Sequence, residues 1–332
     1  MSVERILIIG PSNIGDGILV SDVVARTSAA FPKAHLTLLV GERAKLLYED
    51  DARIHTLVDL DALEGAWAKI RLTAQLIGYQ PSLVIDLRDT AYPFLLKPWR
   101  AWRYVLKPPR HIRHMHERHL WKLAKQAPAV VAQPVHKRVS SLGFTPRDRQ
   151  QVEQICRRLG VTPEKRFAML CPGARSHIKR WVAEGFAAVA DKLAQEFGFE
   201  IILSGEPEEE PIIDDVRRHM QTQAHSTVGL TTIRQLGLLM RQMKLVVTND
   251  SASLHLACAV DAPTVAVFGP TDAYKYGPWG TCTATVRRRL FCSPCEKAQC
   301  RFSHECMRLI APEQVMQAAR EVLSARPRAV AR

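Results

Sequence analysis

The sequence has 332 residues, which is enough for two domains with separate hydrophobic cores. No apolar run reaches the roughly 18 residues of a membrane-spanning helix, and the first residues lack a secretory signal pattern. We therefore expect neither a helical membrane protein nor a secreted one, but a soluble, cytoplasmic protein. The formal net charge of +13 favours an anionic partner, such as a phosphorylated substrate, nucleic acid or an acidic membrane surface.

The first part of the chain alternates strand-like apolar runs with helical stretches. In chain order these are RILIIG (5–10), GILVSDVVARTSAAF (17–31), HLTLLVG (35–41), LLYED (46–50) and PSLVIDLRD (81–89). Such alternation predicts βαβ units, which form a parallel sheet with helices on both faces. We predict that this first domain spans residues 1–145.

The loop after the first strand, GPSNIGDGI (10–18), lacks both the G-x-G-x-x-G spacing of a dinucleotide site and the Gly-Lys-Ser/Thr of a P-loop. It places Asp16 between two glycines, just before a helix that we expect to start near Ile18. A helix N-terminus stabilises a carboxylate, and flanking glycines allow a substrate to approach closely. Asp16 is thus a candidate functional group; the alternative is that it caps the helix.

A strongly basic segment lies between Lys97 and Lys125, with nine Lys or Arg residues against one acid, Glu117. Aromatic residues interleave with these charges, and aromatics beside cations can stack on or cover a ligand; they are Trp99, Trp102, Tyr104 and Trp121. This favours a binding face built from helical pieces and loops. The alternative is a solvated basic surface.

The second part begins with a helix, RDRQQVEQICRRLG, that Gly160 closes. A second α/β series and a final helix then follow, and they predict a second domain over residues 146–332. The last helix packs either on this domain or back toward the first one. The segments of the second domain are RFAMLCPGA (166–174), WVAEGFAAVADKLAQEF (181–197), EIILSG (200–205), a helix from Glu208, STVG (226–229), TIRQLGLLMRQM (232–243), KLVVTND (244–250), SASLHLACAV (251–260), PTVAVFG (263–269) and PEQVMQAAREVL (312–323).

Two open α/β domains in one chain predict a cleft between them, with ligands at the carboxyl ends of the strands. In the loop PGARSHIKRW, Lys179 and Arg180 precede a helix, where a cation and free N–H groups suit a phosphate. The alternative is a solvated pair of charges. After EIILSG come Glu206 and residues 208–210. These acids either stabilise a helix N-terminus or accept hydrogen bonds from ribose hydroxyls.

The stretch NDSASLHLA carries the strongest signal among these loops. Asp250 and Ser251 occupy a strand-to-helix turn whose N–H groups can bind a pyrophosphate oxygen. His255 follows on the same helical face as Ser251, although a half-buried structural histidine is the alternative. Thr271 and Asp272 close another strand-end loop. Together these loops predict a nucleotide site in the second domain.

Eight cysteines in a chain expected to be cytosolic argue against a disulfide framework. Four of them occur in CSPCEKAQCRFSHEC at spacings that could hold a structural zinc or iron ion; they are Cys292, Cys295, Cys300 and Cys306. The alternative is a set of reduced thiols that pack a loop.

The stretches NIGDGI, PGARSHIKRW, NDSASLHLA and FGPTDA, in this order, resemble the ADP-heptose:lipopolysaccharide heptosyltransferases, which are glycosyltransferase family 9. With its late C-S-P-C motif, the chain is most similar to the heptosyltransferase II type. The resemblance implies the GT-B architecture, with two facing, doubly wound Rossmann-like domains, an interdomain cleft and the donor nucleotide in the C-terminal domain.

The resemblance also implies a reaction, in which L-glycero-D-manno-heptose passes from ADP-heptose to the lipopolysaccharide inner core with inversion and without a required cofactor. Asp16 matches the family's general base and Lys179 the lysine that neutralises the departing diphosphate. The implied donor-binding residues are Arg175, Lys179, Glu209, Asp250, Ser251, Ala252, His255 and Thr271. The predicted acceptor-binding residues are Asn13, Gly15, Arg110, Arg113 and Arg118.

The anionic acceptor and the basic segment together predict a peripheral position on the inner membrane and no nucleic-acid partner. Ala252 stands where the family often has glycine, and Asp22 where it often has proline. Two other functions stay open: a family 9 transferase that uses another nucleotide sugar or a protein acceptor, and a non-catalytic protein that binds a nucleotide sugar or nucleic acid.

Overall fold

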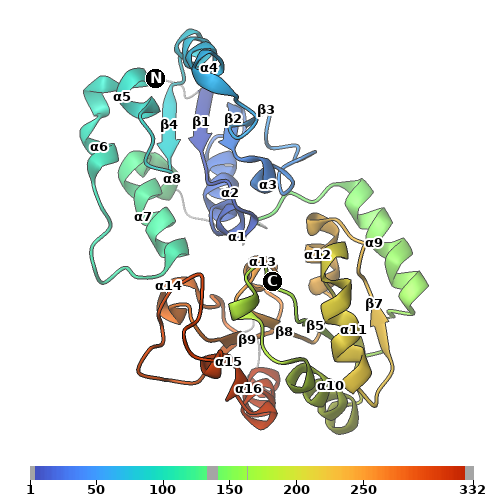
Figure 1. The fold of residues 1–332 in the computed structure, drawn as a ribbon. Coiled ribbons are helices and arrows are strands. Elements are labelled where there is room, and N and C mark those ends of the chain that lie inside the picture. Colours follow the sequence, from blue (N-terminus) through green and yellow to red (C-terminus); the bar gives the residue numbers. More distant parts are fainter. Residues whose placement is uncertain (1–3, 133–140, 163, 326–332) are drawn as a thin grey trace. The chain divides into compact units, whose positions relative to one another are not determined.

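A computed structural model describes residues 4–132, 141–162 and 164–325 of the chain (Figure 1). The chain divides into two compact units, Met1–Thr145 (unit 1) and Pro146–Arg332 (unit 2). Each unit has its own parallel sheet, with strand order β3-β2-β1-β4 in unit 1 and β10-β9-β8-β5-β6-β7 in unit 2. The two Rossmann-like α/β units predicted from the sequence are confirmed, whereas the cleft between them stays a prediction.

The most apolar strand of unit 1, β1, lies inside its sheet. It pairs in parallel with β2, starting with Arg5 opposite His35. The strands of this sheet are β1 (Arg5–Ile9), β2 (His35–Val40), β3 (Thr56–Asp59) and β4 (Leu83–Asp86). β3 was not predicted, because this edge strand is only partly buried and lacks a continuous apolar run.

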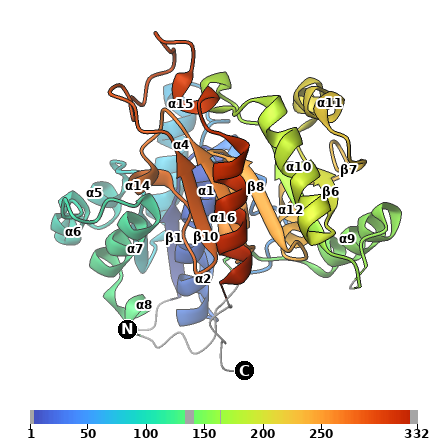
Figure 2. The same ribbon diagram turned by 90° about the horizontal axis from the view of Figure 1, so that it is seen from below.

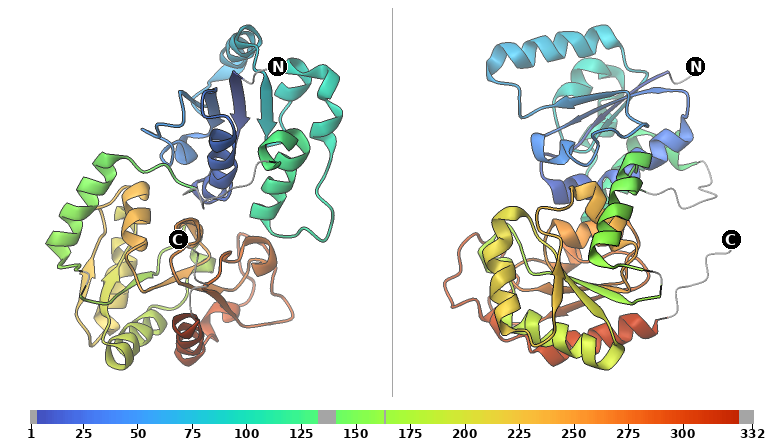
Figure 3. Two further views of the ribbon diagram at one scale, coloured as in Figure 1. Left: turned by 180° about the vertical axis from the view of Figure 1, so that it is seen from behind. Right: turned by 90° about the vertical axis from the view of Figure 1, so that its right-hand side faces the viewer.

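Helices cover both faces of this sheet. They are α1 (Ile14–Leu19), α2 (Ser21–Ala30), α3 (Glu42–Lys45), α4 (Gly65–Tyr79), α5 (Tyr92–Leu96), the 3₁₀ helix η1 (Pro98–Arg100), α6 (Trp102–Val105), α7 (Met115–Gln126) and α8 (Pro128–Val131). α4, α5 and α6 pack on one face, and α4 is seen along that face in the right-hand view of Figure 3 (light blue). α7 contacts β4, α1 and α2, and also its chain neighbours α6 and α8. Residues 46–50, expected to be helical, form turns after α3.

The sheet of unit 2 is larger, and its central strands are fully buried. Its strands are β5 (Phe167–Cys171), β6 (Glu200–Leu203), β7 (Ala224–Ser226), β8 (Leu245–Asn249), β9 (Thr264–Phe268) and β10 (Thr283–Arg287). β10 was not predicted, because this edge strand carries alternating small and polar residues rather than a hydrophobic run. The edge strand β4 is fully buried and was predicted, so the weak apolar pattern of β3 and β10, rather than edge position alone, explains why they were missed.

The helices of unit 2 again lie on both faces of the sheet. They are α9 (Pro146–Leu159), η2 (His177–Lys179), α10 (Ala183–Phe197), η3 (Pro207–Glu209), α11 (Glu210–His219), α12 (Ile233–Met240), α13 (Ala252–Ala259), α14 (Ala273–Tyr276), α15 (Glu305–Arg308) and α16 (Pro312–Ser324). The last helix, α16, packs against β9, β10 and α10 of its own unit (Figure 2). In the described part of the chain, no helix combines the length and hydrophobicity needed to cross a membrane.

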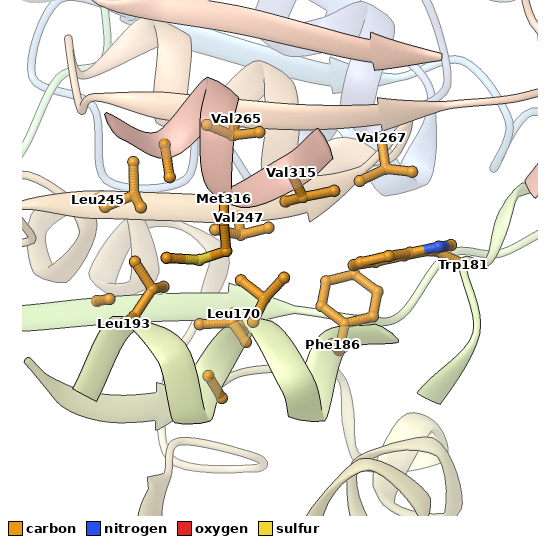
Figure 4. Packing of buried hydrophobic residues seen from close by; sticks show 14 of the residues in the cluster. Leu170, Trp181, Phe186, Leu193, Leu245, Val247, Val265, Val267, Val315 and Met316 are labelled. Atoms are coloured by element: carbon orange, nitrogen blue, oxygen red, sulfur yellow. The ribbon is translucent and has the colours of Figure 1, made fainter. Parts of the chain in front are cut away.

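The main core of unit 2 lies between its sheet and the pair α10 and α16. Phe186 of α10 and Met316 of α16 are fully buried against Val247 of β8 (Figure 4). Because these side chains exclude water completely, each contributes roughly 1.5–3 kcal/mol to folding. This core fixes the strands whose carboxyl ends carry the polar loops.

A buried ion pair attaches α9 to the rest of unit 2. Arg234 of α12 donates to Asp148 of α9 over 2.5 Å, and their side chains are only 5% and 12% exposed. Beside this pair, Gln235 donates to Gln151 over 2.7 Å. The first helix of the unit is therefore held by polar contacts that water does not screen well.

We expect Arg234→Met to lower the free energy of unfolding by about 3–5 kcal/mol, because Asp148 would stay buried without its cation. Arg157→Met is a matched control, since Arg157 forms an exposed pair with Glu153 at 3.9 Å and should cost less than about 1 kcal/mol. Urea denaturation measures both values. Equal losses in the two variants would contradict the role of the buried pair.

Candidate functional site

The strand order of unit 2 reverses between β5 and β8. From β5 the chain proceeds to β6 and β7 on one side, whereas β8, β9 and β10 lie on the other. At such a reversal the loops leaving the two strands diverge, which makes the carboxyl ends of the strands the usual ligand position in open α/β sheets. We call the loops after β5, β6, β8 and β9 (residues 172–181, 204–209, 250–251 and 269–272) the unit 2 edge.

Lys179 and Asp250 meet at this reversal. Lys179 ends η2 in the loop after β5, Asp250 follows β8 directly, and the Lys179 Nζ to Asp250 Oδ2 distance is 2.7 Å. The Asp250 side chain is 6% exposed and that of Lys179 is 34% exposed. An ammonium has three N–H donors, so a contact with one carboxylate oxygen leaves donors for an anionic ligand. The structure thus joins two residues that the sequence analysis predicted separately.

Asn249, the last residue of β8, holds the loop that carries Lys179. Its fully buried side chain accepts a hydrogen bond from the Trp181 N–H (3.0 Å) and donates one to the Pro172 carbonyl (2.7 Å). These two partners are the first and last residues of the loop 172–181. The sequence analysis did not assign a role to Asn249, although an amide that ends a strand of apolar residues is a detectable signal.

Two further contacts reinforce this loop. The Trp181 indole N–H donates to the Ile310 carbonyl (3.1 Å), and Arg180 Nε donates to the Ala174 carbonyl (2.7 Å). Arg175, a predicted donor-binding residue, lies in the same loop and is exposed. The loop is consequently fixed at both ends, with basic side chains between them.

Glu209 approaches the same loop from η3. Its carboxylate accepts the Glu206 N–H (3.0 Å) and lies over Gly173, where a Cβ would be only 2.2 Å from Glu209 Oε2. Gly173 therefore permits the approach of this carboxylate to the loop. Burial raises the pKa of Glu209, although the Glu206 N–H and the nearby Arg180 oppose the rise. The helix that follows, α11, begins at Glu210 rather than at Glu208.

Ser251, Ala252 and His255 lie at the start of α13, as predicted. Ser251 is the N-cap residue, with its Oγ 3.4 Å from Thr248 Oγ1, and Ala252 is the first helical residue. His255 lies one turn on, is 6% exposed and stacks on Trp279, with ring centroids 5.6 Å apart. The first N–H groups of a helix have no intrahelical acceptor, which gives α13 the means to bind an anion at this edge.

Thr271 completes the unit 2 edge and is buried in the loop after β9. The neighbouring Pro270 carbonyl accepts the N–H groups of Cys295 (3.0 Å) and Glu296 (2.9 Å), so the cysteine-rich loop supports the loop of Thr271. Neither the contact of Trp279 with His255 nor the support from the cysteine-rich loop was predicted, because both join residues that are distant in sequence.

The four clustered cysteines lie near one another. Burial and the neighbouring thiols of Cys300, Cys292 and Cys295 raise the pKa of Cys306 to about 11. Within residues 4–132, 141–162 and 164–325, no three His, Cys, Asp or Glu side chains are placed to hold a metal ion. A structural zinc or iron ion at these cysteines stays a prediction.

Asp16 of unit 1 lies within a helix, not before one. The expectation of a helix start near Ile18 was wrong: α1 begins at Ile14 with Asn13 as N-cap, which puts the half-buried Asp16 in the first turn. Glycines were treated as a break, but short helices tolerate them where they allow close packing. The first turn still stabilises a carboxylate through the helix dipole and its free N–H groups.

Gly17 allows α1 to pack closely on α3 and the turn after it, rather than leaving space for a substrate. A Cβ at Gly17 would lie 2.9 Å from Leu47 Cδ1 and 3.0 Å from the Ala44 Cβ, and the Tyr48 hydroxyl donates to its carbonyl (2.8 Å). This corrects the expectation that both glycines beside Asp16 open space for a ligand; for Gly15 that expectation stays a prediction.

The strand order of unit 1 reverses between β1 and β4, so the loops after these strands (residues 10–13 and 87–91) form the unit 1 edge. The Gln126 side chain of α7 makes two hydrogen bonds to the backbone of Asp86, at 2.7 and 2.9 Å. Lys122 of α7 donates to Asp89 (2.6 Å). Thus α7 is fixed beside this edge, which the sequence analysis did not foresee.

The predicted acceptor-binding residues lie around these elements. Asn13 is exposed at the unit 1 edge, and Gly15 is half-buried in α1. Arg110 and Arg113 are exposed on the segment that leads into α7, and Arg118 of α7 donates to the Ile112 carbonyl (3.3 Å). The three arginines therefore belong to one end of α7.

Comparison with known proteins gives a consistent result. The model of glycosyltransferase family 9 (heptosyltransferase) matches residues 100–305. The lipooligosaccharide heptosyltransferase 2 of Haemophilus influenzae is 24% identical over 317 residues, 86% of this chain and 88% of that protein. The enzyme of the same name from Campylobacter jejuni is 33% identical over 164 residues, and this match spans about half of each protein (48% and 51%).

A solved structure shares the fold. ADP-heptose lps heptosyltransferase II of Escherichia coli superimposes with a TM-score of 0.71 at 19% identity, covering 96% of this chain and 98% of that one. Both proteins therefore have two Rossmann-like units in one chain.

We expect Asn249→Ala to destabilise the protein by about 2–4 kcal/mol, because it leaves the Trp181 N–H and the Pro172 carbonyl without their buried partner. Urea denaturation measures this loss, and limited trypsin cleavage after Lys179 or Arg180 should become faster. Asn13→Ala is the control, since the exposed Asn13 side chain makes no capping hydrogen bond. If both variants matched the wild type, Asn249 would not hold the loop.

Proposed function

The chain belongs to glycosyltransferase family 9, and from this premise we propose that it transfers L-glycero-D-manno-heptose from ADP-heptose to the inner core of lipopolysaccharide. The observation that carries the proposal is the partly exposed ammonium of Lys179, fixed by Asp250 at the strand reversal of unit 2. The names of the relatives from Haemophilus influenzae and Campylobacter jejuni support heptose as the transferred sugar.

The proposal assigns the donor to the unit 2 edge. The diphosphate accepts hydrogen bonds from Lys179, Arg175 and the first N–H groups of α13, beside Ser251 and Ala252. The Glu209 carboxylate accepts the ribose hydroxyls, as an acid near a strand end does in many nucleotide domains. Thr271 and His255 contact the sugar and diphosphate. His255 keeps its orientation because it stacks on Trp279.

In the proposed reaction an acceptor hydroxyl attacks the anomeric carbon of the heptose. The new bond forms as the bond from that carbon to the β-phosphate oxygen breaks, so a single displacement inverts the centre. Asp16 takes the hydroxyl proton as general base. The negative charge that develops on the departing ADP is neutralised by Lys179 and the α13 N–H groups.

The acceptor assignment follows the charge of unit 1. Asn13 and Gly15 would lie beside the attacking hydroxyl, and Arg110, Arg113 and Arg118 would bind the carboxylates and phosphates of the lipopolysaccharide core. Such an acceptor is anchored in lipid, so we place the enzyme in the cytoplasm, peripherally on the inner membrane. No nucleic acid is a partner in this proposal, and no cofactor takes part in it.

The two catalytic assignments predict different losses: Asp16 should affect only the rate of transfer, and Lys179 both the rate and ADP binding. Asp16→Asn should lower kcat about 10²–10⁴-fold with the Kd for ADP unchanged, because only proton transfer is lost. Lys179→Met should weaken ADP binding by about tenfold or more, because a charge-assisted hydrogen bond is lost. Calorimetry with ADP and a transfer assay with ADP-heptose and defined core acceptors separate the two effects.

Asp214→Asn and Lys192→Met are the matched controls, since Asp214 pairs with Arg217 and Lys192 with Glu313 at the surface. Transfer at the wild-type rate by Asp16→Asn would remove the base assignment. Release of ADP only with a sugar other than heptose would overturn the proposed substrate and identify a different family 9 donor.

A further inference from the structure

The basic aromatic segment divides between the two faces of the unit 1 sheet. Leu96 of α5 and Tyr104 of α6 pack in the same cluster as Leu72 and Leu76 of α4. After this the chain passes the edge strand β4, and α7, which also contacts α6, packs against α1 and α2 on the other face (Figures 1 and 3). The residues predicted to bind the acceptor, 110–118, lead into and begin α7, whereas residues 92–105 pack on the α4 side of the sheet.

We call the outward side of α4, α5, η1, α6 and residues 106–107 the α4–α6 face. Three indoles stand out on it: Trp67 is 83% exposed, Trp99 67% and Trp102 60%. Nine of the fifteen large hydrophobic side chains exposed in the described part of the chain belong to these elements, of which α4 packs on α5, α5 on η1 and η1 on α6; they are Trp67, Ile70, Ile77, Phe94, Leu95, Trp99, Trp102, Val105 and Leu106. Exposed apolar side chains concentrated on neighbouring elements are typical of interaction surfaces.

The charge of the α4–α6 face has one sign. Neither residues 65–79 nor residues 92–107 contain an Asp or Glu, and both stretches contain cations: Lys69, Arg71, Lys97, Arg100, Arg103 and Lys107. Lys97 Nζ lies 5.1 Å from the centroid of the Trp99 ring, and Arg103 Cζ lies 5.2 Å from that of Trp102. Cations and indoles are thus presented side by side on the same surface.

This combination fits one occupant better than others. Indoles are most stable at the level of lipid headgroups, and each Lys or Arg near an anionic membrane adds to binding. A symmetric contact with a second copy would bring the two positive faces together, which is unfavourable. A sugar or phosphate ligand alone would leave the aliphatic side chains, such as Leu95 and Val105, in water.

We propose that the α4–α6 face docks unit 1 on the surface of an anionic phospholipid bilayer, with Trp67, Trp99 and Trp102 among the headgroups and the cations on lipid phosphates. The inference deepens the peripheral location in the proposed function by naming its surface, and it assigns residues 92–107 to the lipid and residues 110–118 to the acceptor. Docking on a bilayer requires no sugar donor, so its test is independent of heptose transfer.

The test is co-sedimentation of the full chain with vesicles of phosphatidylcholine, with or without phosphatidylglycerol, in the absence of any nucleotide sugar. The wild type should bind only the anionic vesicles, and binding should weaken as salt is added. Trp99→Ser/Trp102→Ser and Arg100→Glu/Arg103→Glu should each lower the partition coefficient at least about tenfold. These side chains are largely on the surface, so circular dichroism should show intact folding.

Matched controls change the same number of residues on unit 2. Phe291→Ser/Phe302→Ser removes two exposed aromatics, and Arg288→Glu/Arg289→Glu reverses two exposed charges; both should bind like the wild type. Transfer to a delipidated core acceptor should be unchanged in the Trp99→Ser/Trp102→Ser variant. Loss of transfer there with intact vesicle binding would contradict the proposal. So would a wild type that ignores anionic vesicles, or one that instead dimerises through this face.

Discussion

The amide of Asn249, at the end of β8, holds the loop that follows β5, the neighbouring strand at which the order of the unit 2 sheet reverses. It bonds to the first and last residues of the loop after β5, while its own strand, β8, continues directly into Asp250. The loop that carries Lys179 therefore cannot move independently of the residue that pairs with Lys179. Because the amide is fully buried, breaking either hydrogen bond would leave a polar group without a partner in an apolar core. The position of the cation follows from this constraint.

In the proposed function, the two units use the carboxyl ends of the strands of the same kind of sheet for opposite chemistry. The unit 2 edge presents a lysine, an arginine and helix N–H groups, all of which attract anions. Beside the unit 1 edge, Asp16 lies half-buried in the first turn of α1, whereas the carboxylate of Asp86 is buried and accepts hydrogen bonds from Arg88 and Thr90. A displacement reaction needs both kinds of group: one to accept a proton, the other to neutralise a leaving diphosphate. This division explains why each unit alone would lack part of the proposed reaction.

Continuous apolar runs made most of the fold predictable. β1, β5, β8 and β9 are buried strands whose sequences could be assigned directly, whereas β3 and β10 are edge strands with weaker patterns. Asp16 was identified, but its helix was started too late, because the packing of Gly17 against Leu47 depends on residues about thirty positions away. The pairing of Lys179 with Asp250 and the bonds of Asn249 are likewise tertiary contacts. Sequence patterns indicate such residues but not which partner each one meets.

We propose that the nucleotide binds the unit 2 edge, and hydrogen–deuterium exchange of the full chain with and without ADP measures this. Exchange should become slower in residues 172–181 and at the start of α13 when ADP is bound, with residues 10–17 unchanged. Protection confined to residues 10–17 would place the nucleotide on unit 1 and rule out the unit 2 edge as its site.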